Sequence, residues 1–180
     1  MWSLAVFWAM ALSHVLLEIA LLNTWLWVPD SVLAVVSMYL LWRWWPRKSV
    51  PPLMRVLLIG FAWLPIAMLL YVAQSLCLLL TDNSILGRAP AHALFIGFFG
   101  SLLVAMVTRV TQGHSGRPLE FGNAARFAFI LIQLTALLRI YAELSPDYLA
   151  WQSAAALLWL CAFLPWVFRS LWIYLTPRAD

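Results

Sequence analysis

Long apolar runs separated by short polar segments constrain the fold of this chain more than any other feature of its sequence. One run extends from Leu53 to Leu80 and contains Arg55 as its single charged residue. A helix of about 20 mostly apolar residues crosses the hydrocarbon core of a bilayer. The composition agrees, because 65% of the 180 residues are hydrophobic and 10% are charged, whereas soluble domains carry about 25% charged residues. We therefore predict an integral membrane protein whose surrounding partner is the lipid bilayer.

The polar breaks divide the chain into six predicted helices, which form a single transmembrane domain over residues 1–180. The predicted helices are Ser3–Trp27, Ser31–Trp45, Leu53–Leu80, Pro90–Val110, Gly122–Glu143 and Pro146–Leu175. We expect Pro29 and Asp30 to separate the first two helices, and we expect Pro65 to kink the third, because proline removes a backbone N–H. The predicted fold class is all-α, a polytopic membrane protein with a bundle of about six transmembrane helices.

Lysine and arginine are distributed unevenly between the two ends of this predicted bundle. Arg88 and Arg139 lie at one end, and the other nine of the eleven lie at the opposite end, namely Arg43, Arg47, Lys48, Arg55, Arg109, Arg117, Arg126, Arg169 and Arg178. Loops rich in lysine and arginine stay in the cytoplasm. We therefore predict that both termini are cytoplasmic. The positive charge lies in loops instead of on a basic face, so we expect no nucleic-acid binding.

Polar residues inside apolar helices are costly and therefore informative. His14 and Glu18 are four residues apart in the first predicted helix, so they share a face. A buried histidine can ligate haem or copper, and a neighbouring carboxylate can fix its tautomer. A polar pair can also simply hold helices together. Both interpretations remain open, and His14 is a candidate ligand.

The fourth predicted helix carries a regular stripe of small residues at Ala93, Gly97, Ser101 and Ala105. Such a stripe permits close approach by another helix. It would also admit a flat macrocycle against the helix. Plain helix packing and a macrocycle site are thus two interpretations of the same pattern.

His92 begins the fourth helix, and an apolar face that includes Met106 follows it. Imidazole binds haem iron and copper, and a thioether binds copper. His92 and Met106 are therefore candidate metal ligands, although a methionine at helical spacing is commonly part of a core. Arg139 and Glu143 are four residues apart in the fifth helix and are expected to form a structural pair.

Arg109, His114 and Arg117 surround the polar loop predicted over Thr111–Glu120. Arginine binds carboxylates in a bidentate manner, so these residues could anchor haem propionates, or they could only anchor the loop at the membrane surface. His92 and Arg109 are seventeen residues apart on one helix, which separates them by about 25 Å. His92 and His114 therefore cannot ligate one metal unless the loop re-enters the membrane deeply, and if a haem is bound, its second axial ligand must come from another helix or another chain.

The fourth helix and its loop resemble the signature of the NnrS family. The matching residues are His92-Ala93-Leu94, Gly97, Gly100, Met106, Arg109-Val110 and Gly113-His114-Ser115-Gly116-Arg117-Pro118-Leu119, and the end Pro177-Arg178-Ala179-Asp180 resembles that family's usual C-terminus. The resemblance implies a multi-pass protein of the bacterial inner membrane that binds haem and copper. It also implies a part in the response to nitric oxide and nitrosative stress.

The resemblance carries further expectations about cofactors and partners. Family members resemble twelve-helix proteins, and this chain resembles their C-terminal half, which implies a homodimer or a partner subunit with six helices. The implied cofactors are haem b, with His92 as an axial ligand candidate, and copper, for which Met106 is the methionine left near the motif. Nitric oxide is the implied small gaseous ligand, and whether the protein is an enzyme is left open.

Two other classes of function remain open at the level of the sequence. The chain could be a haem-b electron-transfer or quinol-linked subunit of a larger complex, and co-purification with a redox partner would then be expected. It could instead be a cofactor-free structural or assembly subunit. In that case all three histidines could be replaced without loss of phenotype.

Overall fold

The computed structural model describes residues 2–178, with side chains from Ser3 onward. Its regular elements in this range are all helical, which confirms the predicted all-α class. They are α1 (Trp2–Ile19), the short 3-10 helix η1 (Asn23–Trp25), α2 (Trp27–Trp44), α3 (Pro52–Phe61), α4 (Trp63–Thr81), α5 (Ala89–His92), the π-helical segment η2 (Ala93–Gly100), α6 (Ser101–His114), α7 (Asn123–Leu144) and α8 (Tyr148–Leu175).

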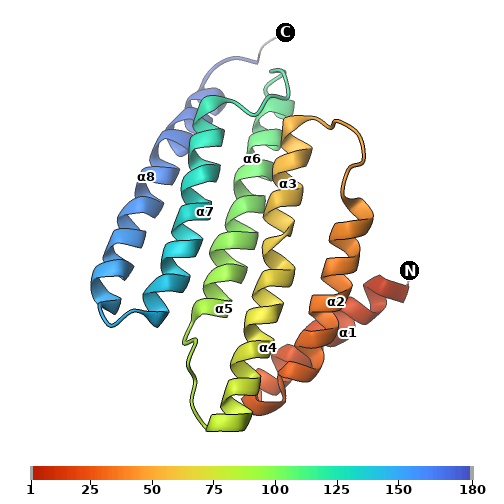
Figure 1. Cartoon of the computed structure of the whole chain (residues 1–180). Coiled ribbons are helices and arrows are strands. Elements are labelled where there is room, and N and C mark those ends of the chain that lie inside the picture. The colour runs from red at the N-terminus through yellow and green to blue at the C-terminus, as the bar shows by residue number, and fades with distance from the viewer. Residues whose placement is uncertain (1, 179–180) are drawn as a thin grey trace.

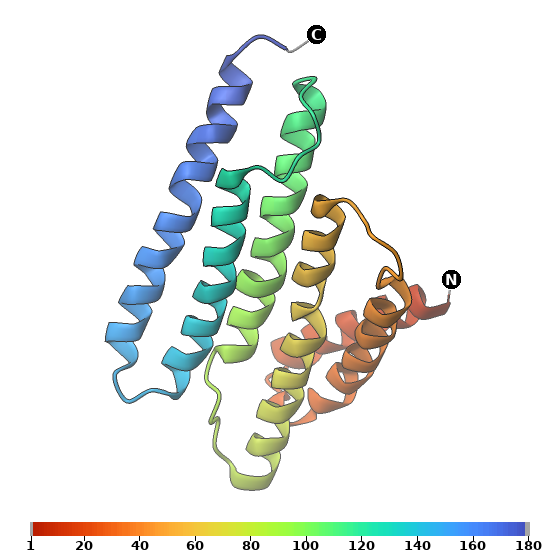
Figure 2. The same ribbon diagram turned by 45° about the horizontal axis from the view of Figure 1, so that its top comes forward.

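The helices lie side by side in a row, as Figures 1 and 2 show. The order across the row is α8, α7, the continuous α5–η2–α6 helix, the α3–α4 pair and α2, with α1 running obliquely across α2. Because each helix packs mainly on its neighbours, its outward faces remain exposed. Many large apolar side chains lie on these faces, among them Trp8, Phe95, Leu149 and Trp172. Such surfaces suit lipid better than water.

Four helical stretches are long and apolar enough to cross a membrane. They are Pro52–Thr81, Ala89–His114, Asn123–Leu144 and Tyr148–Leu175, and Ser3–Ile19 is a shorter apolar helix. The loops after α2 and α6 lie at one end of the bundle with the end of α8, so the arginine-rich segments gather there (Figure 1). The membrane character agrees with prediction, while the count of six spans and the cytoplasmic termini stay predictions.

The break between the first two helices lies earlier than predicted. Helix α1 ends at Ile19, and Leu21 adopts a positive φ of 57°. Pro29 and Asp30 were predicted to break the chain, but both belong to the first turn of α2. Proline is tolerated there because the first-turn N–H groups have no partner within the helix. The correction places Asp30 inside a helix, where its direction is fixed.

The predicted kink near Pro65 is confirmed by the division of the third apolar run into α3 and α4. The division lies at Ala62, whose own N–H still bonds to Leu58 at 3.0 Å. Pro65 has no N–H to donate to the carbonyl of Phe61, four residues earlier, and its ring crowds that carbonyl. The chain therefore changes direction one turn before the proline.

The fourth apolar helix is longer than predicted. It continues to His114 and contains the π-helical segment η2, so the loop predicted from Thr111 begins only at Ser115. All four residues of the predicted stripe, namely Ala93, Gly97, Ser101 and Ala105, are buried.

The stripe packs against α3 and α4. A Cβ added at Gly97 would lie 2.7 Å from Cγ and Cε3 of Trp63, and one added at Gly60 would lie 2.7 Å from Cβ of Ser101. Trp63 Nε1 donates to Gln133 Oε1 at 2.6 Å, and Gln133 Nε2 donates to Ser101 Oγ at 2.7 Å. The helix-packing interpretation of the stripe is confirmed, and no space for a flat macrocycle remains on this face.

Candidate functional site

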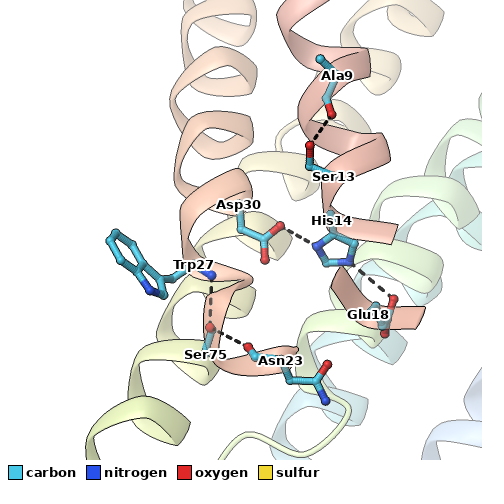
Figure 3. A network of polar contacts seen from close by, with 8 residues as sticks. All are labelled: Ala9, Ser13, His14, Glu18, Asn23, Trp27, Asp30 and Ser75. Atoms are coloured by element: carbon cyan, nitrogen blue, oxygen red, sulfur yellow. Dashed lines mark hydrogen bonds and ion pairs between the residues drawn. The ribbon is translucent and has the colours of Figure 1, made fainter. Parts of the chain in front are cut away.

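The crossing of α1 over α2 brings the side chains of His14 and Asp30 together (Figure 3). His14 Nδ1 lies 2.6 Å from Asp30 Oδ1, and the Asp30 side chain is fully buried. Because a carboxylate accepts hydrogen bonds, the contact places a hydrogen on Nδ1. The second oxygen of Asp30, Oδ2, is also buried and has no hydrogen-bond partner in the described part of the chain.

The other ring nitrogen of His14 faces the opposite way. Nε2 lies 3.7 Å from Oε2 of Glu18, whose side chain is 58% exposed, and Figure 3 shows the ring between the two carboxylates. The ring of Tyr71 packs edge-on against His14 with its centroid 5.0 Å away. A metal-bound histidine commonly donates its second N–H to a carboxylate, which orients the ring. His14 has this arrangement, with Nε2 as the nitrogen that remains for a ligand.

The segment that presents Asp30 is tied to α4. Ser75 Oγ accepts the backbone N–H of Trp27 at 3.1 Å and donates to the carbonyl of Asn23 at 2.8 Å. These two bonds fix the junction between η1 and α2 (Figure 3). An acidic residue in a first helical turn also interacts favourably with the helix dipole. Asp30 is therefore held in place before any ligand arrives.

An apolar groove of about 510 Å³ lies between α1 and the start of α2, and it is lined by Ser13, the neighbour of His14 in the sequence, but not by His14 itself. Met10 and Leu17, one turn before and one turn after the histidine, line it together with Trp25 and Pro29. Ligand sites are typically concave and apolar with a few placed polar groups. The groove has the apolar character, and the His14 ring is a polar group on the same helix, α1. Met10 also brings a thioether one helical turn from the imidazole.

His92 is paired in a different way. Its Nε2 lies 3.1 Å from Oε1 of Glu143, and Glu143 Oε2 accepts the backbone N–H of Arg88 at 3.1 Å. The predicted pairing of Arg139 with Glu143 is not the one that forms, because Arg139 Nη1 donates to Gln152 Oε1. Nε2 of His92 is thus hydrogen-bonded to a carboxylate, and among residues 3–178 no side chain is bonded to its Nδ1.

Met106 lies away from both histidines. Its side chain is 45% exposed and lines an apolar groove of about 470 Å³ between α6 and α8, together with Phe99 and Trp159. His92 and Met106 are fourteen residues apart on one helix, which separates them by about 21 Å. The structure therefore does not bring these two predicted metal ligands together.

The three predicted propionate anchors lie apart from His14. Arg109 and His114 are exposed. Arg117 is partly buried, and its Nη2 donates to Thr176 Oγ1 at 2.8 Å. All three lie at the arginine-rich end of the bundle, whereas the first turn of α2, which carries Asp30, lies at the other end (Figure 1). His14 and the arginines therefore belong to different regions of the protein.

Sequence reasoning missed Asp30, because it was assigned to a helix break instead of a helix. A carboxylate within an apolar stretch was the available signal, since such a group is buried only with a partner. Within residues 3–178, no group of three or more His, Cys, Asp or Glu side chains is placed to hold a metal ion.

Comparisons with known proteins give one match. The family model described as NnrS protein matches residues 1–178, which is nearly the whole chain. No curated protein matches. No solved structure matches.

Proposed function

Because the chain belongs to the NnrS family, we propose that it is a haem-binding protein of the bacterial inner membrane that takes part in the response to nitric oxide and nitrosative stress. One observation carries the haem part of this proposal. It is the pair of His14 and Asp30, in which a fully buried carboxylate lies 2.6 Å from Nδ1 and leaves Nε2 for a ligand.

The residues present fit a haem bound through one imidazole. A bound haem would supply an iron that can bind an imidazole and a small gas such as nitric oxide. His14 Nε2 would provide the axial lone pair. Asp30 would hold the ring direction and increase the electron density on Nε2 by accepting the Nδ1 hydrogen. The groove lined by Met10, Leu17 and Trp25 would provide apolar contacts.

Glu18 has a distinct part in this proposal. Its carboxylate faces Nε2 at 3.7 Å and its side chain is 58% exposed. An exposed side chain can turn away without leaving a buried group unpaired. Glu18 would therefore move aside when Nε2 takes a ligand, whereas buried Asp30 would stay.

His14 is favoured over His92 as the axial ligand. Nε2 of His92 is hydrogen-bonded to Oε1 of Glu143, whose side chain is only 8% exposed, so ligation through Nε2 would leave Oε1 unpaired while Oε2 keeps the backbone N–H of Arg88. Leaving such a group unpaired costs about 1–3 kcal/mol or more. His14 needs no such rearrangement.

The optical spectrum of the purified protein tests the proposal. Haem is supplied during expression, and the Soret band is compared with the protein absorbance. We expect a Soret band in the original protein, its loss in His14→Ala, and its retention in His114→Ala, a matched control at an exposed histidine. A protein without a Soret band under these conditions would contradict haem binding. Loss only in His92→Ala would transfer the axial role to that residue.

Copper and the oligomeric state are proposals that the same preparation can test. The family resemblance implies copper, for which Met10 offers a soft ligand, while the remaining copper ligands would come from residues other than His14, whose two nitrogens are assigned to Asp30 and to haem. The exposed apolar faces suit a second copy or a partner six-helix subunit as well as lipid. We expect metal analysis to find copper with the haem, and the mass in detergent to exceed that of one 20.5 kDa chain.

A cellular experiment tests the nitric oxide part. A bacterial strain that lacks the gene should grow more slowly than its parent in the presence of a nitric oxide donor. The original gene should restore growth and His14→Ala should not. Equal growth of the two strains would contradict a role in nitrosative stress.

A further inference from the structure

A second cavity lies at the arginine-rich end of the bundle. It has a volume of about 410 Å³ and is enclosed by the end of α6, the loop after it, the first turn of α7 and the last turns of α8. Figure 1 shows these four segments meeting at one end. None of its lining residues belongs to the groove between α1 and the start of α2.

Arg117 indicates which kind of ligand this cavity can bind. Its Nη2 donates to Thr176 Oγ1 at 2.8 Å, and that hydroxyl donates to the carbonyl of Ile173 at 3.1 Å, so the guanidinium is fixed at one edge. Its Nη1 is buried and has no hydrogen-bond partner among the described residues. A buried charged donor without an acceptor is costly. A bound oxyanion would supply the missing acceptor.

A second arginine and free backbone donors line the same cavity. Arg169 of α8 faces it, as does the first turn of α7 from Asn123 to Ala125. Helix α7 has no acidic residue in its first turn and no side-chain cap. The first N–H groups of a helix have no partner within the helix and favour anions. Among the lining residues Glu120 is the single acid, so the two arginines leave an excess positive charge.

Hydrogen bonds hold the loop after α6, which forms one side of the cavity. Gln112 Nε2 donates to the carbonyl of Glu120 at 2.7 Å, and Gln112 Oε1 accepts the backbone N–H of Glu120 at 3.0 Å. Both polar atoms of the Gln112 side chain are thereby used by the loop. The cavity shape is therefore set by the loop itself and does not depend on a ligand to form.

We propose that this cavity binds a phosphate group, and that the phosphate belongs to the headgroup of an anionic phospholipid. It lies at the end of two candidate spans, α7 and α8, where lipid headgroups lie. Phe168 and Trp172, on either side of Arg169 in α8, are exposed by 65% and 63% and provide apolar and interfacial contacts for the lipid. Basic pockets between spanning helices are suited to such headgroups. The proposal does not rest on haem binding.

Thermal unfolding of the delipidated protein in detergent measures the binding. Phosphatidylglycerol is titrated, with phosphatidylcholine as the zwitterionic control and inorganic phosphate as the control for a free anion. We expect phosphatidylglycerol to raise the unfolding temperature more than either control. Stabilisation by inorganic phosphate alone would overturn the lipid assignment, and no stabilisation by any of the three would overturn the site.

Single substitutions test whether phosphatidylglycerol binds in this cavity. Arg117→Gln and Arg169→Gln should each weaken phosphatidylglycerol binding about 10-fold or more, because each removes a charged donor. Arg109→Gln is the matched control, since this exposed arginine lies at the same end but does not line the cavity. Glu120→Gln should strengthen binding, which keeps the test valid if an arginine variant fails to fold. Equal affinities of Arg117→Gln and Arg109→Gln, or weaker binding by Glu120→Gln, would overturn the proposal.

The same variants separate a lipid phosphate from a haem propionate. If the cavity holds a lipid, Arg117→Gln should lose phosphatidylglycerol binding and keep the haem content of the original protein. A fall in haem content with unchanged lipid binding would assign the cavity to propionates and overturn the lipid proposal.

Discussion

Replacing Gly97 by alanine should destabilise the protein, because no space exists for a methyl group between η2 and α4. The added Cβ would lie 2.7 Å from Cγ and Cε3 of Trp63 and would also overlap Cδ2. Ordinary carbon contacts are about 3.5–4.0 Å. Trp63 is only 8% exposed, and its Nε1 is bonded to Gln133 at 2.6 Å, so the ring cannot turn without losing that bond.

The expected loss of stability follows from the steric clash with Trp63 and from the loss of its hydrogen bond to Gln133. Overpacking of a close contact costs about 1–3 kcal/mol, and an interhelical hydrogen bond in a membrane protein contributes about 0.6 kcal/mol. The clash should therefore cost about 1.5–3.5 kcal/mol. Alanine is intrinsically better than glycine in a helix by about 0.8–1 kcal/mol, which offsets part of the cost. We expect a net destabilisation of about 0.5–2.7 kcal/mol.

Gly113→Ala is the matched control for this change. Gly113 lies in the same continuous helix, and an added Cβ would meet nothing within 4 Å. The difference between the two variants removes the intrinsic helix preference and leaves the clash. The measurement is the free energy of unfolding in mixed detergent and SDS, followed by tryptophan fluorescence. If Gly97→Ala proved as stable as Gly113→Ala, the close packing of η2 against Trp63 would be refuted.

Three further predictions concern the polar contacts and the orientation. Gln133→Leu should lower the free energy of unfolding by about 0.6–1.7 kcal/mol, because it removes acceptor and donor contacts to Trp63 and Ser101; an unchanged value would contradict this network. Glu143→Ala should cost about 0.5–1.5 kcal/mol, because it removes the acceptor of the partly buried His92 ring and of the exposed Arg88 N–H, and Glu143→Gln should recover much of the loss in the same unfolding assay. A reporter fused after the last residue should be active in the cytoplasm, and activity only outside would reverse the predicted orientation.

The helices could be predicted because lipid imposes a simple rule on the sequence. Each spanning helix must be apolar throughout, so the runs that became α7 and α8 are visible without knowledge of their neighbours. The stripe of small residues from Ala93 to Ala105 likewise predicted a close helix contact. Its partner, Trp63, could not be predicted, since it lies on a distant segment and nothing in its own neighbourhood marks it.

The candidate site could be predicted only in part, because its partners come from separate helices. His14 is identifiable as a polar residue in an apolar run, but its contact with Asp30 depends on the angle at which α1 crosses α2. Glu143 was assigned to Arg139 because the two are four residues apart, whereas the close neighbour in space is His92. Spacing along one helix thus predicts shared faces, and it does not predict which helix will face them.

The haem affinity of two carboxylate variants tests the central claim most directly. Haem is titrated into the purified apoprotein, and the dissociation constants of Asp30→Asn and Glu18→Gln are compared with that of the original chain. If Asp30 orients His14 and leaves Nε2 for iron, Asp30→Asn should bind haem about 10–100-fold more weakly, and Glu18→Gln should bind at least as tightly as the original. Unchanged affinity in Asp30→Asn, or a loss confined to Glu18→Gln, would contradict the account.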